Sequence, residues 1–243
     1  MSISTKTMEL LKLARCADVC DALDSMGLQD TYEMDSSMRP LIPCIRFCGI
    51  ARTIELVKAT ARVPATDYDT FDKLQYTPKQ QGGYSFTTNL DRPSVKKPEL
   101  TSGDVLVVAA HGSCGVCGSA NALEWFIDGV AGFVIDGGMR DTPEAILEEL
   151  PVFSTSISYK ACQGRNQIFS SDEPCVCAGV LVHSGDVIVA DNDGVIVVPQ
   201  ELADEVAVRA YKIQQKDRID RRHFYERQKR AYDETVELLP DLD

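Results

Sequence analysis

The sequence predicts an α/β fold, and three observations support this. Two strand–loop–helix units follow one another directly between residues 103 and 150. A group of short apolar strands with tight turns then occupies 180–199, and a long charged helix follows it. Strands that alternate with helices form parallel sheets, whereas strands joined by tight turns pair antiparallel.

The composition fits one large domain or two small ones. The chain has 243 residues and a formal net charge of −12, which argues against a nucleic-acid backbone as its main partner. No apolar run approaches the roughly 20 residues that span a bilayer, so we expect no membrane segment. Residues 1–12 lack the basic and apolar stretches of a signal peptide. We therefore expect a cytoplasmic protein.

The first predicted element is an amphipathic helix from about Met8 to Met26, ended by Gly27. Asp18, Asp21 and Asp24 lie three residues apart along it. An additional metal site is one interpretation. We favour a solvated acidic face, because a helix surface rarely supplies a closed set of oxygen ligands.

A strand is expected over Arg46–Lys58, followed by a polar, irregular stretch at about 60–100 that contains several prolines and glycines. Loops of this length in compact domains are usually functional lids or mobile segments. Five aromatic residues within it argue against complete disorder. We interpret the chain as a single domain over 1–243 with an elaborated insertion at about 60–100.

The two strand–loop–helix units form the centre of the predicted sheet. Val105–Ala110 is a continuous apolar strand, as expected for a sheet buried on both faces. Thr142 is a candidate N-cap with Pro143 in the first helical position. The remaining expected elements are a glycine-rich loop at His111–Gly118, a helix over Ser119–Asp128, a strand over Phe133–Asp136, a helix over Pro143–Leu150 and a strand from Pro151 to Ser156.

A β-meander is expected next, with strands at Val180–Val182, Val187–Ala190 and Val195–Val198. Asp191 and Asp193 are candidate calcium ligands, but an acidic hairpin turn is the commoner reason for such a sequence. A charged helix is expected from Glu201 to about Val236. Its basic residues near Arg218–Arg222 fit a solvated or subunit-packing face better than a nucleic-acid patch, given the acidic total.

Nine cysteines are present, several close in sequence, so metal binding has to be considered. Cys114 and Cys117 have the spacing of two zinc ligands, but no second pair of matching form follows. A thioredoxin-like redox role is a further alternative. In a reducing compartment we expect free thiols that pack as small apolar groups.

The chemistry is expected in the loops that end the two strands, His111–Gly118 and Gly137–Asp141. If the strands are parallel neighbours, both loops open at one sheet edge, where α/β proteins bind ligands. Glycines in the first loop allow backbone amides to converge on an anion at the start of the next helix. Arg140 supplies a fixed fork for a carboxylate or enolate, and Asp141 a hard oxygen for a divalent cation.

Other roles in these loops remain open or are weaker. The glycine spacing matches neither a dinucleotide-binding motif nor a P-loop. His111 is a candidate base, although a histidine that ends a strand is more often a hydrogen-bonding loop residue. Asp136 is more consistent with a structural role than with a ligand.

The segment Val134-Ile135-Asp136-Gly137-Gly138-Met139-Arg140-Asp141-Thr142-Pro143-Glu144 resembles the class II pyruvate aldolases of the RraA-like family. These enzymes cleave 4-hydroxy-4-methyl-2-oxoglutarate and 4-carboxy-4-hydroxy-2-oxoadipate, and they share a fold with the regulator of ribonuclease E activity. Further matches are distributed along most of the chain, at 18–27, 39–41, 103–108 and 185–199, and only about 60–100 falls outside the resemblance.

The resemblance implies an αββα sandwich with a central mixed sheet, assembled as a homotrimer or homohexamer with sites between subunits. By this resemblance Asp141 would ligate Mg²⁺ or Mn²⁺, Arg140 would stabilise a pyruvate enolate, and Glu144 would orient water at the cation. The substrate, a small 2-oxo acid, would be held by Arg140 and by the glycine-rich loop, at Gly115, Val116, Cys117, Gly118 and Ser119.

One departure from the family concerns the residue 21 positions before Arg140, where the aldolases commonly have a carboxylate and this chain has Ser119. The favoured hypothesis is a metal-dependent lyase that releases pyruvate from a 4-hydroxy-2-oxo acid, with oxaloacetate decarboxylation as a further reaction. The alternatives are a non-catalytic regulator that binds a ribonuclease or helicase, and a different metal-dependent enolate lyase or dehydratase.

Overall fold

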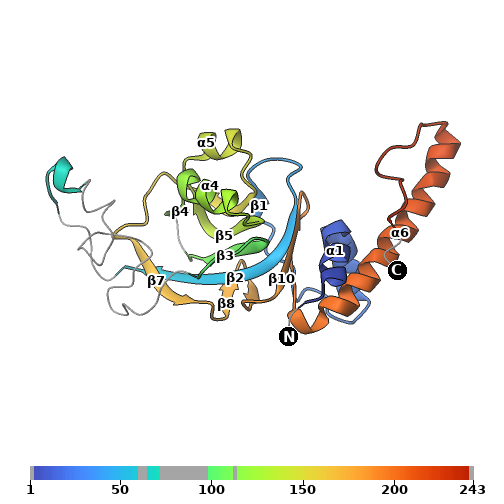
Figure 1. Ribbon diagram of the computed structural model, residues 1–243, viewed down its shortest axis with the longest axis horizontal. Coiled ribbons are helices and arrows are strands. Elements are labelled where there is room, and N and C mark those ends of the chain that lie inside the picture. The colour runs from blue at the N-terminus through green and yellow to red at the C-terminus, as the bar shows by residue number, and fades with distance from the viewer. Residues whose placement is uncertain (1–2, 60–64, 72–97, 112–113, 241–243) are drawn as a thin grey trace.

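The computed structural model describes residues 3–59, 65–71, 98–111 and 114–240, and its centre is a mixed β-sheet with helices on one face (Figure 1). Four central strands run parallel, and the outer ones are antiparallel. This confirms the α/β class with a mixed sheet. In order across the sheet the strands are β1 (Arg39–Pro40), β6 (Val152–Ile157), β5 (Gly132–Met139), β3 (Asp104–Ala109), β2 (Phe47–Lys58), β10 (Val187–Asp191) and β11 (Gly194–Val198).

Both faces of the central strands are buried, as the continuous apolar sequence predicts. On the face covered by helices α4 (Ser119–Ile127) and α5 (Thr142–Leu147), Leu106 of β3 packs in one cluster with Phe133 of β5. On the opposite face, Val107 and Val134 pack towards a small two-stranded sheet of β8 (Cys175–Cys177) and β9 (Val180–Val182). The parallel strands β3 and β5 are neighbours, so their following loops meet at one edge.

Strand β5 is longer than the sequence indicated. It continues past Asp136 and through the glycine pair to Met139, because short β4 (Gly115–Cys117) pairs with it on one side and β6 on the other. A Cβ at Gly138 would lie 2.6 Å from the backbone oxygen of Cys114, so only glycine permits this approach. The prediction that the strand ends at the glycines was wrong.

Helix α5 also differs from expectation at both ends. Its N-cap is Asp141, not Thr142, and its last helical residue is Leu147, not Leu150. Asp141 has φ 57° and ψ 43°, a left-handed conformation that aspartate tolerates better than most residues. A second left-handed residue, Glu149, lies just beyond α5. Because a left-handed residue cannot continue a right-handed helix, α5 ends before it.

The expected β-meander is only partly present. Strands β10 and β11 form the predicted hairpin, with Asp191 accepting from the amide of Asp193 across the turn. Strand β9, however, pairs with β8 and not with β10. The β8 strand and β7 (Asn166–Ser171), which pairs with β2, were not predicted, because short strands with partly polar sequences carry little periodicity.

The single helix expected over about 8–26 is two helices, α1 (Thr5–Leu13) and α2 (Cys16–Asp24). Ala14 and Arg15 are extended between them. Asp18 accepts from the backbone amide of Arg15 at 3.0 Å and from its guanidinium at 2.6 Å, and its side chain is 2% exposed. Asp18 therefore caps the second helix from inside the protein, and the acidic-face interpretation holds only for exposed Asp21.

Helix α6 (Ala203–Gln228), preceded by a short 3-10 turn at Gln200–Leu202, packs with α1 and α2 beyond β10 and β11 (Figure 1). It ends about eight residues earlier than predicted, at left-handed Lys229, and the chain then turns back along it. The guanidinium of Arg222 donates to the backbone oxygen of Val236, which is fully buried. The basic cluster on α6 thus binds the chain's own C-terminal segment.

Most of the expected 60–100 insertion lies outside the described residues. Within the part that is described, residues 68–71 form one helical turn. Among all described helices, none is both long enough and apolar enough to cross a membrane.

Candidate active site at the end of strand β5

Arg140 and Asp141 lie directly after β5, at the edge where the parallel strands end. The Arg140 amide donates to the backbone oxygen of Cys117 at 2.9 Å, which extends the pairing of β4 and β5 by one step. Asp141 then reverses the chain direction and begins α5. The backbone under both side chains is therefore held by the sheet on one side and by a helix on the other.

Gly118 brings the first predicted loop against Asp141. It is the N-cap of α4, and no side chain caps this helix. A Cβ on Gly118 would lie 2.7 Å from Asp141 Oδ2 and 3.4 Å from Arg140 Cγ. The carboxylate thus lies at a helix N-terminus, where unpaired amides and the helix dipole attract negative charge. The structure brings together the two loops that the sequence analysis expected at one edge.

Gly115 has a similar role on the other side of Arg140. A Cβ there would lie 2.7 Å from Arg140 Cβ and 2.5 Å from the backbone oxygen of Ser158. The Gly115 amide donates to the Lys160 oxygen at 2.7 Å, so this residue contributes space and not a free amide. Val116 and Cys117, also on β4, are buried, and their backbone positions Gly118 at the start of α4.

Arg140 and Asp141 interact only loosely with each other. Arg140 Nε lies 3.3 Å from Asp141 Oδ1, and the two side chains are 32% and 41% exposed. An ion pair this exposed contributes little free energy. Both groups can therefore turn to a ligand without disrupting a strong internal contact.

The other predicted site residues flank this pair. Ser119, the first residue of α4, is buried, whereas Glu144 is exposed in the first turn of α5. Residues three apart at a helix start lie on the same side, which places Glu144 beside Asp141. His111 is exposed and has φ 45°, with its Nε2 3.6 Å from a carboxylate oxygen of Glu55. His111 follows the end of β3 by two residues, as expected.

Asp136 has the structural role that the sequence analysis favoured. Its carboxylate accepts from the Ala178 amide at 3.0 Å and from the Thr155 hydroxyl at 3.3 Å. It therefore connects β5 to β6 and to the β8–β9 turn.

The segment between β6 and β7 adds residues that the sequence analysis missed. Cys162 lies with its Sγ 3.5 Å from that of Cys114, and Asn166 Oδ1 lies 2.9 Å from Cys114 Sγ. The two cysteines are 48 positions apart, so no spacing rule could have paired them. Cys114 and Cys117, which are close in sequence, have different contacts, since Cys117 Sγ faces the backbone oxygen of Gly118 at 3.8 Å.

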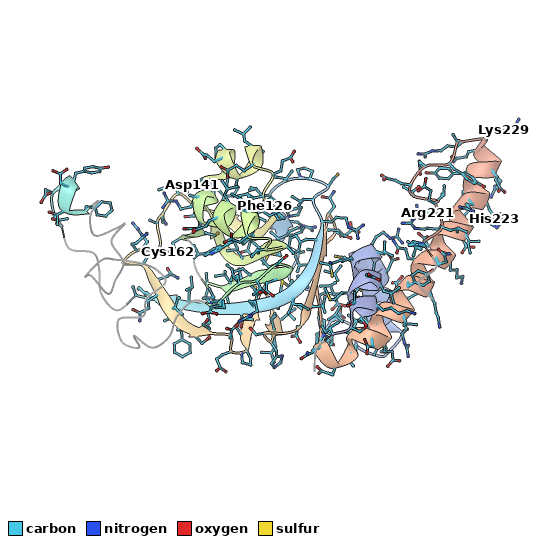
Figure 2. The ribbon with its side chains drawn as sticks, in the orientation of Figure 1. Phe126, Asp141, Cys162, Arg221, His223 and Lys229 are labelled. Atoms are coloured by element: carbon cyan, nitrogen blue, oxygen red, sulfur yellow. The ribbon has the colours of Figure 1, made fainter. Side chains whose placement is uncertain are left out.

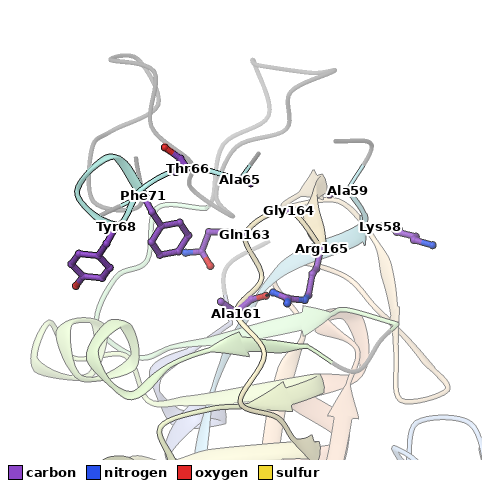
Figure 3. A pocket seen from close by; sticks show the side chains of 10 residues that line it. All are labelled: Lys58, Ala59, Ala65, Thr66, Tyr68, Phe71, Ala161, Gln163, Gly164 and Arg165. Atoms are coloured by element: carbon purple, nitrogen blue, oxygen red, sulfur yellow. Dashed lines mark hydrogen bonds between the residues drawn. The ribbon is translucent and has the colours of Figure 1, made fainter. Parts of the chain in front are cut away.

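Two cavities lie near this segment. One of about 930 Å³ is bounded by the end of β2, residues 65–71 and the 161–165 turn, with Phe71, Gln163 and Arg165 among the side chains around it (Figure 3). A second, of about 520 Å³, contains Cys114, Lys160 and Arg165. Neither cavity is lined by Arg140 or Asp141. The side chains of Arg140 and Asp141 are 32% and 41% exposed, and Asp141 lies beside α4 and α5 in Figure 2.

One other cluster of possible metal ligands occurs among the described residues. Ligand atoms of Cys20, Asp24 and Glu33 lie within 4.8 Å of one another. The Cys20 thiol lies 3.5 Å from a Glu33 oxygen, and partial burial together with the acidic neighbours raises its pKa to about 11. Such a thiol stays protonated at neutral pH and is a weak ligand.

Comparison with known proteins agrees with this architecture. The model of the RraA-like family, described as Aldolase/RraA, matches residues 16–197. Protein DlpA of Legionella pneumophila is 28% identical over 210 residues, which are 84% of this chain and 29% of DlpA. A protein of Halalkalibacterium halodurans named "Putative 4-hydroxy-4-methyl-2-oxoglutarate aldolase" is 35% identical over 126 residues, covering 49% of this chain and 57% of that protein. The chain thus spans less than two thirds of the length of these two relatives.

Two solved structures cover nearly the whole fold. An uncharacterised protein from Pseudomonas syringae superimposes with a TM-score of 0.69 at 25% identity, covering 92% of this chain and 95% of that one. RraAS2 of Streptomyces coelicolor, described as an unusual member of the RNase ES inhibitor RraA family, has a TM-score of 0.69 at 26% identity over 91% and 98% of the two chains. With the family model matching three quarters of its length, this chain belongs to the RraA-like family.

Proposed function

We propose that this protein is a divalent-metal-dependent lyase that cleaves a 4-hydroxy-2-oxo acid by a retro-aldol reaction and releases pyruvate. The observation that supports it best is the contact between the two loops, in which the Arg140–Asp141 pair lies against Gly118 at the uncapped start of α4. A cationic fork, a carboxylate and free helix amides within one small area suit a small anionic substrate.

The residues present suit Mg²⁺ or Mn²⁺. Asp141 offers a carboxylate that caps no backbone amide of its own helix, and its Oδ2 faces a glycine where a side chain would fill the space. Magnesium usually takes only one or two protein carboxylates and completes its shell with water and substrate. Asp141 would hold the cation and Glu144 would orient water near it. When bound, the cation would act as a Lewis acid towards the substrate's oxygen atoms.

Arg140 supplies the electrostatic part of the reaction. As the C–C bond breaks, negative charge develops on the pyruvate oxygen, and a guanidinium already in position stabilises that charge without reorganisation. The Arg140 stem lies close to Gly115 and Gly118, and the side chain is 32% exposed, so its charged end is accessible to a substrate. The amides from Cys117 to Ser119 at the start of α4 would hold the pyruvyl carboxylate.

Purified protein incubated with 4-hydroxy-2-oxo acids, and with oxaloacetate, tests this proposal by pyruvate release. We expect release that requires Mg²⁺ or Mn²⁺, stops with a chelator, and falls about 100-fold or more in Arg140→Ala and Asp141→Ala, as for loss of a charge-stabilising group. Arg209→Ala on α6 and Asp21→Ala on α2 are matched controls outside the site and should retain activity. Full activity in both site variants would contradict the assigned roles.

The similarity to RraAS2 supports a second candidate, a non-catalytic regulator that binds a ribonuclease. This role needs neither Asp141 nor a cation. Calorimetric titration with Mn²⁺ and a pull-down with a ribonuclease distinguish the two functions. Strong ribonuclease binding without Mn²⁺ binding would favour the regulator, whereas Mn²⁺ binding that Asp141→Ala abolishes would favour the lyase.

A further inference from the structure

We propose that Cys114 and Cys162 form a redox-active thiol pair in which a peroxide oxidises Cys114 and Cys162 then closes a disulfide. The pair contacts Gly115 at the start of β4, and Gly115 lies against Arg140, so closure of the disulfide would also alter the site described above. That second consequence rests on the proposed lyase function, whereas the disulfide itself does not.

The two sulfur atoms are already close to bonding distance. They are 3.5 Å apart, and a disulfide bond is about 2.05 Å long, so closure needs a relative movement of about 1.5 Å. Cys162 Sγ also lies 3.4 Å from the backbone oxygen of Gly115. Cys114 lies in the loop before β4, and Cys162 lies in the loop between β6 and β7. Loops tolerate such a movement better than the central strands do.

The surroundings of Cys114 favour its thiolate. The hydrogen bond from Cys162, together with the positive charges of Arg165 and Lys160, lowers the pKa of Cys114 to about 7, while burial opposes this. The hydrogen bond to Cys114, and after it burial, raise the pKa of Cys162. Asn166 Oδ1 accepts from the Cys114 thiol at 2.9 Å, which favours the protonated form. Thiol and thiolate are therefore both populated near neutral pH.

The cavity beside Cys114 gives an oxidant access. It measures about 520 Å³ and carries four basic side chains, Lys58, His111, Lys160 and Arg165. Cys114 itself is only 3% exposed at the cavity surface, which favours a small oxidant such as hydrogen peroxide over a bulky disulfide. By contrast, burial raises the pKa of Cys48, Cys117 and Cys175 to about 12, so these thiols are protonated and slow to react.

The chemistry balances with peroxide as the only co-reactant. The Cys114 thiolate attacks one peroxide oxygen, the O–O bond breaks, and hydroxide leaves as the S–O bond of a sulfenic acid forms. The Cys162 sulfur then attacks Cys114 Sγ, the S–O bond breaks, and the oxygen leaves as water with the thiol proton. The two sulfur atoms lose two electrons in total, and the peroxide gains them.

Formation of the disulfide would affect the position of Arg140 through β4. Cys114 is followed directly by Gly115, whose backbone lies so close to Arg140 that an added Cβ would be 2.7 Å from Arg140 Cβ. The Gly138 amide donates to the Cys114 oxygen at 3.1 Å. A shift of Cys114 towards Cys162 therefore disturbs both the end of β5 and the space that confines the arginine.

Peptide mass spectrometry tests the disulfide. The fully reduced protein is treated with hydrogen peroxide, its remaining thiols are alkylated, and it is digested without reductant. We expect a linked peptide pair joining Cys114 to Cys162, present in the matched control Cys48→Ser and lost in Cys114→Ser. In Cys162→Ser, Cys114 should be trapped as a sulfenic acid that dimedone labels. An unmodified Cys114, or a link between other cysteines in its place, would overturn the proposal.

Pyruvate release, measured on the same samples, tests the link to the site. Oxidation should lower it about tenfold or more, as for a small misplacement of a catalytic group, and dithiothreitol should restore it, while peroxide-treated Cys114→Ser should keep its activity. The linked peptides with unchanged activity would refute the coupling to Arg140. The linked peptides in a protein that never releases pyruvate would refute the lyase proposal and leave the disulfide standing.

Discussion

Gly118 is the residue at which the candidate site leaves no room for a side chain beside the Asp141 carboxylate. Its φ of −106° is available to any residue, so its requirement is for space and not for backbone freedom. In Gly118→Ala the added Cβ must displace the Asp141 carboxylate from a position 2.7 Å away. We expect metal-dependent turnover to fall about 10- to 100-fold, while the urea midpoint changes little because Asp141 is exposed enough to move.

Enzyme kinetics and urea unfolding on one preparation of Gly118→Ala check this expectation. A large drop in stability with normal turnover would mean that Gly118 serves packing and not the site.

The reactivity of the Cys114 thiol is predicted to depend on pH. Because its pKa is lowered to about 7, its thiolate fraction rises from below half to above half as the pH passes through 7. Its folded-state pKa lies below the ordinary value, so its contribution to stability is present at higher pH and is lost as the pH falls through 7. The rate of Cys114 alkylation by iodoacetamide, followed by mass spectrometry between pH 5.5 and 8.5, should be half-maximal near pH 7.

In Cys162→Ser the same measurement should change in a defined way. A serine hydroxyl can still donate a hydrogen bond, so the midpoint should rise less than in Cys162→Ala. Equal midpoints in wild type and Cys162→Ala would contradict the assigned cause of the lowered pKa.

At the scale of single elements, the break between α1 and α2 depends on one buried carboxylate. Asp18→Ala removes the acceptor for the Arg15 amide and guanidinium and should lower the free energy of unfolding by about 1–3 kcal/mol. Asp21→Ala, three residues on in the same helix but exposed, is the matched control and should cost less than about 0.5 kcal/mol. Urea denaturation of both variants measures the difference, and equal costs would contradict a capping role for Asp18.

The same elements show what the sequence could and could not predict. Strands such as Val105–Ala110 and the β10–β11 hairpin were predicted correctly, because continuous apolar runs and acidic-glycine turns are local signals. The break at Ala14–Arg15 was missed because a helical apolar pattern runs across it, and the partner that decides it, the Arg15–Asp18 contact, is read only from the structure. The length of β5 was missed because it depends on pairing with β4 and β6.

The candidate site was likewise predicted only in part from the sequence. Arg140 and Asp141 were identified from their position after an apolar strand, and their contact with Gly118 follows from two parallel neighbouring strands. The N-cap role of Asp141 was assigned to Thr142, because Thr is a good N-cap and a left-handed aspartate leaves no sequence pattern. The Cys114–Cys162 pair has a sequence separation that only tertiary structure can close.

At the scale of the whole molecule, the exposed apolar side chains of α4 and α5 point to self-association. Ile127 is 74% and Leu147 is 84% exposed, and Phe126 and Ile146 beside them are also exposed. Neighbouring apolar groups exposed in this way usually mark an interface. We expect a homotrimer or homohexamer in which these helices lie at the subunit contact.

Light scattering coupled to size-exclusion chromatography tests the assembly. Ile127→Asp combined with Leu147→Asp should shift the mass towards the 26.7 kDa of one chain. The control Ile219→Asp, on α6 and 44% exposed, should leave the mass unchanged if α6 lies outside the contact. A wild-type protein that elutes as a monomer at micromolar concentration would refute this expectation.

The amide of Arg140, which extends the pairing of β4 and β5, ties the backbone of the site to the slowest-opening part of the protein. Amides in a central sheet exchange their hydrogens only through large-scale unfolding, whereas those in surface loops exchange through local opening. Arg140 should therefore exchange with the core, even though its side chain is at the surface. Its guanidinium can sample many orientations on a fixed base, and adaptation to new substrates can proceed through the surrounding loops without loosening that base.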